Sequence, residues 1–111
     1  MTPEQQQIMI AVACGWKILD TPELYGSYAC YAKDPTGKPF PGIPDYLHDL
    51  NAMHDAEQSV VYRDEHGCGL KYSQNLRRIT EADRSFERWQ WGATATQRAE
   101  AFLRTIGKWI E

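Results

Sequence analysis

Arginine and aromatic residues interleave over residues 71–91, where the chain is best equipped to bind an anion. An arginine guanidinium pairs with a phosphate through two hydrogen bonds, and a tryptophan ring stacks on a base. The stretch also holds five basic residues against three acidic ones. We therefore expect a pocket for a small anionic or nucleotide ligand here, and its candidate residues are Arg77, Arg78, Arg84, Arg88, Trp89 and Trp91. The alternative is a structural segment with one tryptophan face in the core and its arginines in solvent.

Tyr28 and Tyr31 are further candidate ligand-binding residues, and they lie in a segment rich in proline, glycine and tyrosine. The two are three positions apart, so in a strand their side chains point to opposite faces. We expect one of them to be exposed, where it suits a ligand or a partner protein. A tyrosine at the rim of a small core is the alternative.

The patterns of catalysis and of metal binding are missing from the sequence. His48 and His54 are six residues apart, about 240° around a helix, so their imidazoles face different directions and no metal site is expected. Cys68 lies between two glycines near His66, and we interpret it as a loop thiol rather than a nucleophile. Phosphate-binding loops, dinucleotide fingerprints, zinc-protease and serine-hydrolase motifs do not occur. We predict a protein with no catalytic residues, cofactor or enzymatic activity.

Length, charge and hydropathy exclude several classes of protein. The 111 residues suit one domain over residues 1–111, since a chain of this length supports one core and not two. The net charge of -3 lacks the general attraction that binding to duplex nucleic acid requires. The longest apolar run, residues 8–14, is far shorter than the ~20 residues of a membrane span, and the chain does not start with a basic secretory signal. We expect no membrane partner and a cytoplasmic location.

Local signals place helices at both ends of the chain. Thr2 and Thr94 are each followed three residues later by glutamine, the pattern of a capping box at a helix start. The first helix is expected over residues 3–14, because Gly15 suits the left-handed position that follows a helix end. In the last helix the apolar period continues through Ile110, so we expect the helix to reach the end of the chain.

Shorter elements fill the region between these helices. The expected elements are strands over residues 16–19, 27–32 and 86–91, a hairpin turn over residues 34–37, and helices over residues 44–58 and 70–80. We expect Trp16 to lie in the core. Three or four helices around a few short strands, without regular strand–helix alternation, indicate an α+β fold with a small, mostly antiparallel sheet.

Three stretches of the chain follow a family pattern: residues 10–16, 43–57 and 93–109. In this order they resemble the ACGW, PDYLNDLNAMHEAE and ATAxQRAEAFLRTxGKW blocks of small phage and prophage proteins that carry the phage ABA sandwich domain. The resemblance implies an α/β/α sandwich, with helices flanking the small sheet, encoded by a bacteriophage or prophage and acting in the bacterial cytoplasm. The family carries no established reaction. Residues 17–42 and 59–91 do not match these blocks, so we expect binding specificity there.

Two functions follow as expectations. The first is a non-enzymatic phage accessory protein, a counter-defence sponge that sequesters a small anionic nucleotide-type signal. The alternative is a protein–protein interaction module that inhibits or adapts a host or phage protein through its tyrosines and through residues 45–65, where six carboxylates face Arg63 alone. A homo-oligomer is compatible with either function.

Overall fold

Four helices and a small antiparallel sheet make up the described part of the chain, so the predicted α+β class is confirmed. The computed structural model describes residues 1–62, 68–82 and 93–110. In chain order the elements are α1 (Pro3–Ala13), β1 (Lys17–Tyr25), β2 (Tyr28–Lys33), β3 (Pro39–Phe40), α2 (Leu50–Ala56), a π-helical turn η1 (Glu57–Val61), α3 (Cys68–Ala82) and α4 (Ala95–Thr105). The predicted strand over residues 86–91 lies outside the described residues.

Threonine side chains start the first and the last helix, as predicted. The Thr2 hydroxyl accepts a hydrogen bond from the backbone N–H of Gln5, and the Gln5 side chain accepts one from the backbone N–H of Thr2. Thr94 and Gln97 form the same reciprocal pair at the start of α4. Each capping box satisfies two backbone donors that the helix itself leaves unpaired, so both predicted helix starts are confirmed.

Glycine ends both helices. At Gly15, φ is +97°, and the next N–H, of Trp16, donates to the carbonyl of Ala11, which closes the predicted C-terminal cap of α1. At Gly107, φ is +76° and the same bonding pattern ends α4 at Thr105. The prediction that this helix reaches Ile110 is therefore wrong: a left-handed glycine turns the chain away from the helix axis.

The second helix begins later than its apolar period predicts. The predicted start was Pro44, but α2 starts at Leu50 because the Asp49 carboxylate accepts hydrogen bonds from the backbone N–H groups of Asn51 and Ala52. An aspartate in this position is a strong start signal, and the preceding residues 44–49 form turns instead. The predicted helix over residues 70–80 is confirmed and extends by two residues at each end, as α3.

The sheet is a meander in the order β1–β2–β3, with all neighbours antiparallel. The turn after β2 forms as predicted, with the N–H of Gly37 donating to the carbonyl of Asp34. Strand β1 runs well past its predicted end, and its register with β2 jumps between Ile18 and Glu23. This irregularity lets an edge strand contain Pro22, which has no N–H to give to a neighbour.

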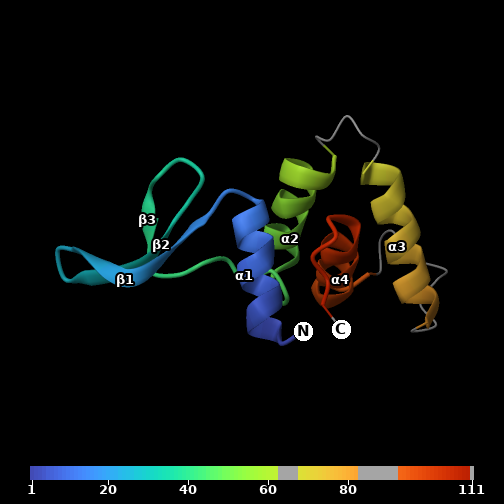
Figure 1. The fold of residues 1–111 in the computed structure, drawn as a ribbon, viewed down its shortest axis with the longest axis horizontal. Coiled ribbons are helices and arrows are strands. Elements are labelled where there is room, and N and C mark those ends of the chain that lie inside the picture. The colour runs from blue at the N-terminus through green and yellow to red at the C-terminus, as the bar shows by residue number, and fades with distance from the viewer. Residues whose placement is uncertain (63–67, 83–92, 111) are drawn as a thin grey trace.

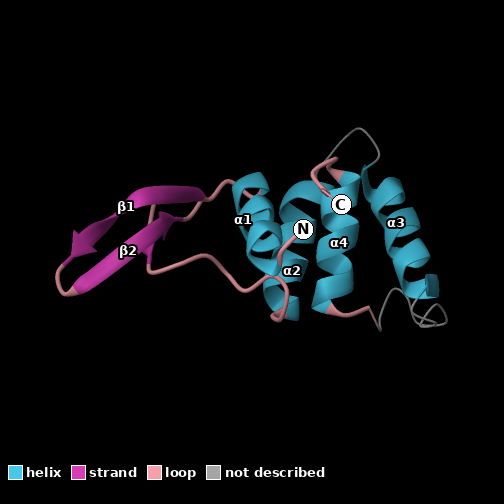
Figure 2. Ribbon diagram, turned by 60° about the horizontal axis from the view of Figure 1, so that its bottom comes forward, coloured by secondary structure: helices cyan, strands magenta, loops and turns pink. Residues whose placement is uncertain are grey.

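The sheet lies beside the helices rather than between two helix layers (Figures 1 and 2). We call residues 17–40, which form this sheet, the β-arm. Its first strand leaves the end of α1, and the β-arm extends away from the cluster of four helices, which gives the molecule a long axis of 49 Å against 28 and 25 Å. The layering is thus simpler than the three-layer sandwich that the family resemblance implies.

The core lies among the helices, with α4 at its centre. Phe102 and Leu103 of α4 are fully buried, and Met53 of α2, Tyr72 of α3 and Ile10 of α1 pack in the same cluster. Trp16, which was expected in the core, is partly buried and packs against the edge of this cluster, while its ring also contacts Phe40 of the β-arm at 5.4 Å between centroids. Within the described residues, no helix combines the length and the apolar character that crossing a membrane requires.

Candidate functional site

Most of the predicted basic and aromatic site cannot be placed. Its candidates Arg84, Arg88, Trp89 and Trp91 lie outside the described residues, whereas Arg77 and Arg78 lie exposed on α3. The Nε of Arg77 is 3.0 Å from Oε1 of Glu81, one turn further along the helix. Arg78 makes no ion pair or hydrogen bond within the described part of the chain. The predicted anion pocket therefore stays a prediction.

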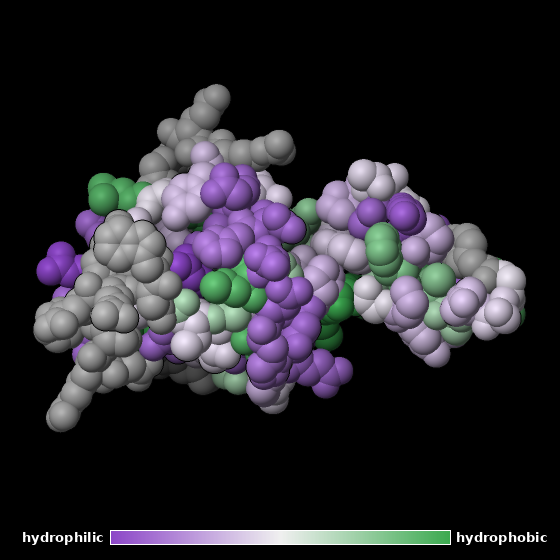
Figure 3. Space-filling model, turned by 180° about the vertical axis from the view of Figure 1, so that it is seen from behind, coloured by the Kyte–Doolittle hydropathy of each residue, from purple (hydrophilic) through white to green (hydrophobic). Residues whose placement is uncertain are grey.

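Tyr28 and Tyr31 are both exposed, by 69% and 50%. The prediction that only one would be exposed is wrong in this respect. The two side chains do point to opposite faces of β2: Cys30 and Ala32 are buried on the face of Tyr28, but Tyr28 lies at the hairpin end of that face and is exposed there. Figure 3 shows the β-arm as a separate lobe with hydrophobic side chains on its surface.

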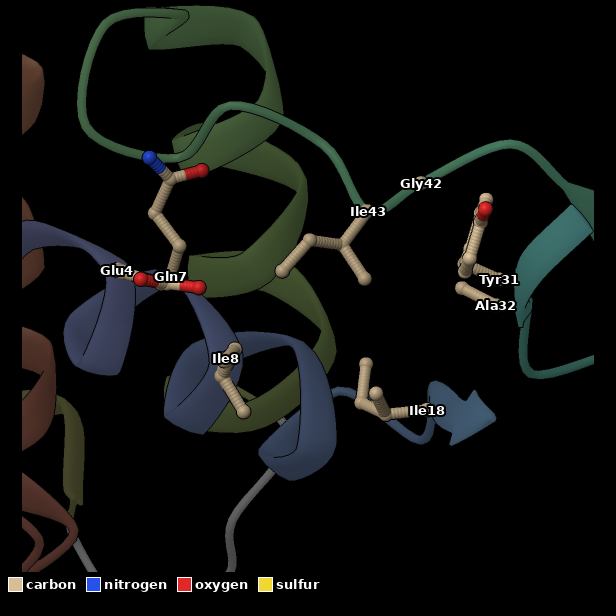
Figure 4. Close-up of a pocket in the computed structure, with 8 residues that line it drawn as sticks. All are labelled: Glu4, Gln7, Ile8, Ile18, Tyr31, Ala32, Gly42 and Ile43. Atoms are coloured by element: carbon tan, nitrogen blue, oxygen red, sulfur yellow. The ribbon is translucent and has the colours of Figure 1, made fainter. Parts of the chain in front are cut away.

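A pocket of about 340 Å³ lies in the angle between α1 and the β-arm, and we call it the arm groove. Figure 4 shows that its walls come from α1, from β1 and β2 of the β-arm, and from the connection that leads to α2. The groove is lined by Glu4, Gln7, Ile8, Ile18, Tyr31, Ala32, Gly42 and Ile43. Its volume is at the lower end of the about 300–1,000 Å³ of small-molecule sites, so it suits one or two side chains.

Regular structure explains why these residues meet. Glu4 and Ile8 are four residues apart on α1 and therefore lie on the same helix face. Ile18 of β1 pairs with Ala32 of β2 in the sheet register, which brings both to the base of the β-arm. Ile43 follows β3 on the connection to α2 and closes the groove from the other side (Figure 4).

The lining chemistry favours a neutral, apolar occupant. Among the lining residues that the structure describes, Glu4 is the one carboxylate and none is cationic. A phosphate or another anion would meet only this negative charge, which repels it. Ile8 and Ile18 expose 37% and 39% of their surface, so the branched side chains can contact an incoming apolar group.

A second pocket, of about 310 Å³, lies near the start of β1 and includes Cys14, Trp16, Tyr46 and Asp55 in its lining. Burial raises the pKa of the Cys14 thiol to about 11, and burial also raises the pKa of Tyr46. A cysteine that stays protonated at neutral pH is a poor nucleophile, because the thiolate is the reactive form. The pocket therefore offers no activated thiol.

A buried ionic cluster was missed by the sequence analysis. The Glu57 carboxylate is 1% exposed, and its Oε2 accepts hydrogen bonds from the Tyr72 hydroxyl at 2.5 Å and from Nη1 of Arg98 at 3.0 Å. The π-helical turn η1 starts at Glu57, whose carbonyl accepts from the N–H of Tyr62 five residues on. The sequence does contain one sign of this cluster. Glu57 continues the apolar face of α2, where an acidic side chain in contact with water is not expected.

The histidines lie in separate surroundings. His48 Nδ1 is 3.0 Å from Oδ1 of Asp45, and His54 Nδ1 is 3.4 Å from Oε1 of Glu57. Within the described ranges, no group of three or more histidine, cysteine or acidic side chains is arranged to hold a metal ion. Cys68, which the sequence analysis placed in a loop, is instead the first residue of α3, and its side chain lies outside the described set.

Comparisons with known proteins give no match for this chain. No protein-family model matches it, and neither the curated proteins nor the solved structures contain a significant match. The resemblance to the phage family therefore stays a prediction, and the arm groove is the feature that bears most directly on function.

Proposed function

We propose that the chain is a non-enzymatic interaction module that holds apolar side chains of a polypeptide in the arm groove. The observation that carries the proposal is a concave apolar site at the base of an arm that exposes further large apolar side chains. Contiguous apolar patches beyond a few hundred Å² are rare on monomeric proteins and mark binding surfaces. The groove lining pairs no base with a nucleophile, so the module binds and does not catalyse.

The family resemblance suggests in which organism and in which compartment this binding would take place. Under the proposal the chain is a phage or prophage accessory protein that acts in the bacterial cytoplasm, where it engages a protein rather than a membrane or duplex nucleic acid. The polypeptide in the groove inserts neutral apolar side chains, because Glu4 is the only charged group among the described residues that line the site.

Photo-crosslinking tests the groove directly. A photoreactive phenylalanine analogue in place of Tyr31 is expected to form a covalent adduct with a polypeptide in bacterial cells, and Ile8→Glu in the same protein should abolish that adduct. Tyr62 is the matched control, since it is exposed to nearly the same extent, 52% against 50%, but follows the last residue of η1 and does not line the groove. Equal adducts from both positions, or none from position 31, would contradict the proposal.

A second candidate function is the binding and sequestration of a small anionic, nucleotide-type ligand, as a counter-defence sponge would do. One observation favours it. Arg78 is exposed on α3 and has no ion pair within the described residues, so its guanidinium is available to a phosphate. Under this proposal Arg78 acts with the arginines and tryptophans that follow α3 in the sequence, and the arm groove takes no part.

A further inference from the structure

The tip and the base of the β-arm carry surfaces that complement each other. At the tip, the large apolar side chain of Leu24 is 78% exposed, on the face of the hairpin that it shares with its partner Ala29, and Tyr28 lies on the opposite face. At the base lies the concave arm groove, to which Ile18 and Tyr31 of the same β-arm contribute. One copy therefore presents both the side chains to be bound and the site that can bind them.

We propose that the occupant of the arm groove is the β-arm tip of a second copy of this chain, with Leu24 of each copy seated in the groove of the other. This inference rests on the proposed function, because it names the partner of the same groove. The two β-arms then lie side by side in opposite directions, and a two-fold axis passes between them.

Two-fold symmetry makes both contacts form together. The separation between tip and base is the same in each copy, so an axis that puts the first tip into the second groove also puts the second tip into the first groove. Leu24 is six residues from Ile18 along β1, about 20 Å or less at the rise of a strand. The assembly closes at two copies, since no tip or groove is left unoccupied.

Charge favours pairing at the β-arm over pairing elsewhere. Residues 17–42 contain three lysines and three carboxylates, so two β-arms can approach without net repulsion. Lys33 Nζ and Glu23 Oε2, 3.2 Å apart, already neutralise each other within one β-arm. By contrast, Asp45, Asp49 and Asp55 are all exposed on residues 45–55, and two copies facing each other there would repel.

Strand β1 also limits how copies can join. It is the edge strand of the sheet, its register is interrupted between Ile18 and Glu23, and Pro22 within that interval cannot donate a backbone hydrogen bond. Continuous addition of strands along this edge is therefore disfavoured. Contact through side chains remains, as the seating of Leu24 in a groove requires.

Sedimentation measurements test the dimer. We expect the wild-type chain to change from monomer to dimer between about 1 µM and about 1 mM, the range of an ordinary transient interface. Leu24→Asp, with Leu24→Lys as a second tip variant, should remain monomeric up to a concentration at least about tenfold higher than the wild type. Leu70→Asp is the matched control: Leu70 is 69% exposed on α3, far from the β-arm, and the variant should dimerise like the wild type.

A mixing experiment tests the reciprocal arrangement. Leu24→Asp destroys the tip and Ile8→Asp destroys the groove, so each variant alone loses both contacts of its dimer. A mixture keeps one intact contact, between the tip of the Ile8→Asp copy and the groove of the Leu24→Asp copy. We expect the mixture to associate at least about tenfold more tightly than either variant alone. Tyr31→Asp serves as the groove variant if Ile8→Asp lowers the melting temperature.

The outcomes separate this inference from the proposed function. A wild-type chain that stays monomeric throughout, a dimer indifferent to Leu24→Asp, or a mixture no tighter than its components each overturns the paired β-arms. A crosslink from position 31 to a different polypeptide would then leave the proposed function standing. A crosslink from position 31 to the tip peptide of a second copy supports both, and the absence of any crosslink together with a monomeric chain overturns both.

Discussion

Glu57 joins three helical segments that are distant in sequence. Its carboxylate is buried between Tyr72 of α3 and Arg98 of α4, and the Nε of Arg98 also donates to the carbonyl of Ala93 at 3.3 Å. Taking a carboxylate and a guanidinium out of water is costly, and only their mutual contact and the added hydrogen bonds offset that cost. The cluster therefore makes the packing of α4 depend on the π-helical turn.

Glu57→Gln should destabilise the protein by about 3–5 kcal/mol, because it leaves the Arg98 charge buried without its partner. Urea unfolding followed by circular dichroism measures the loss. Glu100→Gln is the control, since it breaks the partly exposed pair between Glu100 and Arg104 of the same helix and should cost less than about 1 kcal/mol. Equal losses of unfolding free energy in the two variants would show that the buried pair stabilises the protein no more than the partly exposed pair does.

Stability should fall in alkaline solution. Burial raises the pKa of Cys14 to about 11 and also raises the pKa of Tyr46 and of Tyr72, so the folded chain holds these protons more tightly than the unfolded chain does. The resulting stabilisation is fully present below the unfolded pKa values, about 9 for cysteine and 10 for tyrosine, and is lost as the pH rises through the folded values.

We therefore expect a melting temperature that is steady up to about pH 9 and declines above it. Calorimetry from neutral pH upward checks this, with Cys14→Ala as the comparison. That variant lacks the cysteine contribution, so its decline should begin only near pH 10, where tyrosines in the unfolded chain ionise. A decline that begins at the same pH in both proteins would argue against a role for the Cys14 proton.

At the scale of the elements, the helix cap at Thr94 contributes measurably to the free energy of unfolding. Thr94→Ala removes the side-chain acceptor of the Gln97 N–H and should cost about 1 kcal/mol, seen as a lower urea midpoint. Neither Thr94 nor any residue of α4 is among the lining residues of the arm groove, so the crosslink from position 31 should persist in the variant. An unchanged midpoint would mean that another group satisfies the first turn of α4.

Two glycines with similar backbone angles should respond differently to substitution. Gly15 has φ +97° and Gly37 has φ +92°, so alanine at either position pays the strain of a left-handed residue, about 1–2 kcal/mol. At Gly15 a Cβ would also lie 3.3 Å from Cβ of Pro35, whereas nothing lies within 4 Å at Gly37. Gly15→Ala should therefore be the more destabilising variant in urea unfolding, and equal losses would contradict a close contact between α1 and the β-arm.

At the scale of the whole molecule, the two proposed binding surfaces, the arm groove and the surface of α3 around Arg78, lie far apart. The arm groove and the β-arm lie next to α1, and α3 with Arg78 lies at the other end of the long axis (Figure 1). An occupied groove and a bound anion therefore do not compete for the same residues. Each proposed function can be tested without disturbing the other.

If the chain binds nucleotides, Arg78→Ala should weaken binding of ATP about tenfold or more, since a hydrogen bond between charged groups contributes about 1.5–3 kcal/mol. Titration calorimetry at low and high salt measures the effect, which should shrink at high salt because exposed charges are screened. Lys17→Ala, which removes an exposed cation on the β-arm, is the control and should bind ATP normally. Absence of ATP binding in the wild type, or equal effects of both changes, would favour the interaction module.

The starts of α1 and α4 and the end of α1 followed from the sequence by itself. The capping boxes at Thr2 and Thr94, the left-handed Gly15 and the turn at residues 34–37 all depend on contacts between residues at most five positions apart, so local patterns determine them. The same reasoning failed at Asp49, where a capping side chain outweighed an apolar period that continued upstream.

Only the tertiary structure decided where the candidate site lies. Tyr31 was a candidate from the start, but Ile8, Ile18 and Ile43 look like ordinary core residues in the sequence, and they form the arm groove because the β-arm folds beside α1. Glu57 likewise meets Arg98 across 41 residues. Exposure and burial depend on which distant segments pack together, and that packing follows from the shape and burial of the whole chain rather than from any pattern within a few neighbouring residues.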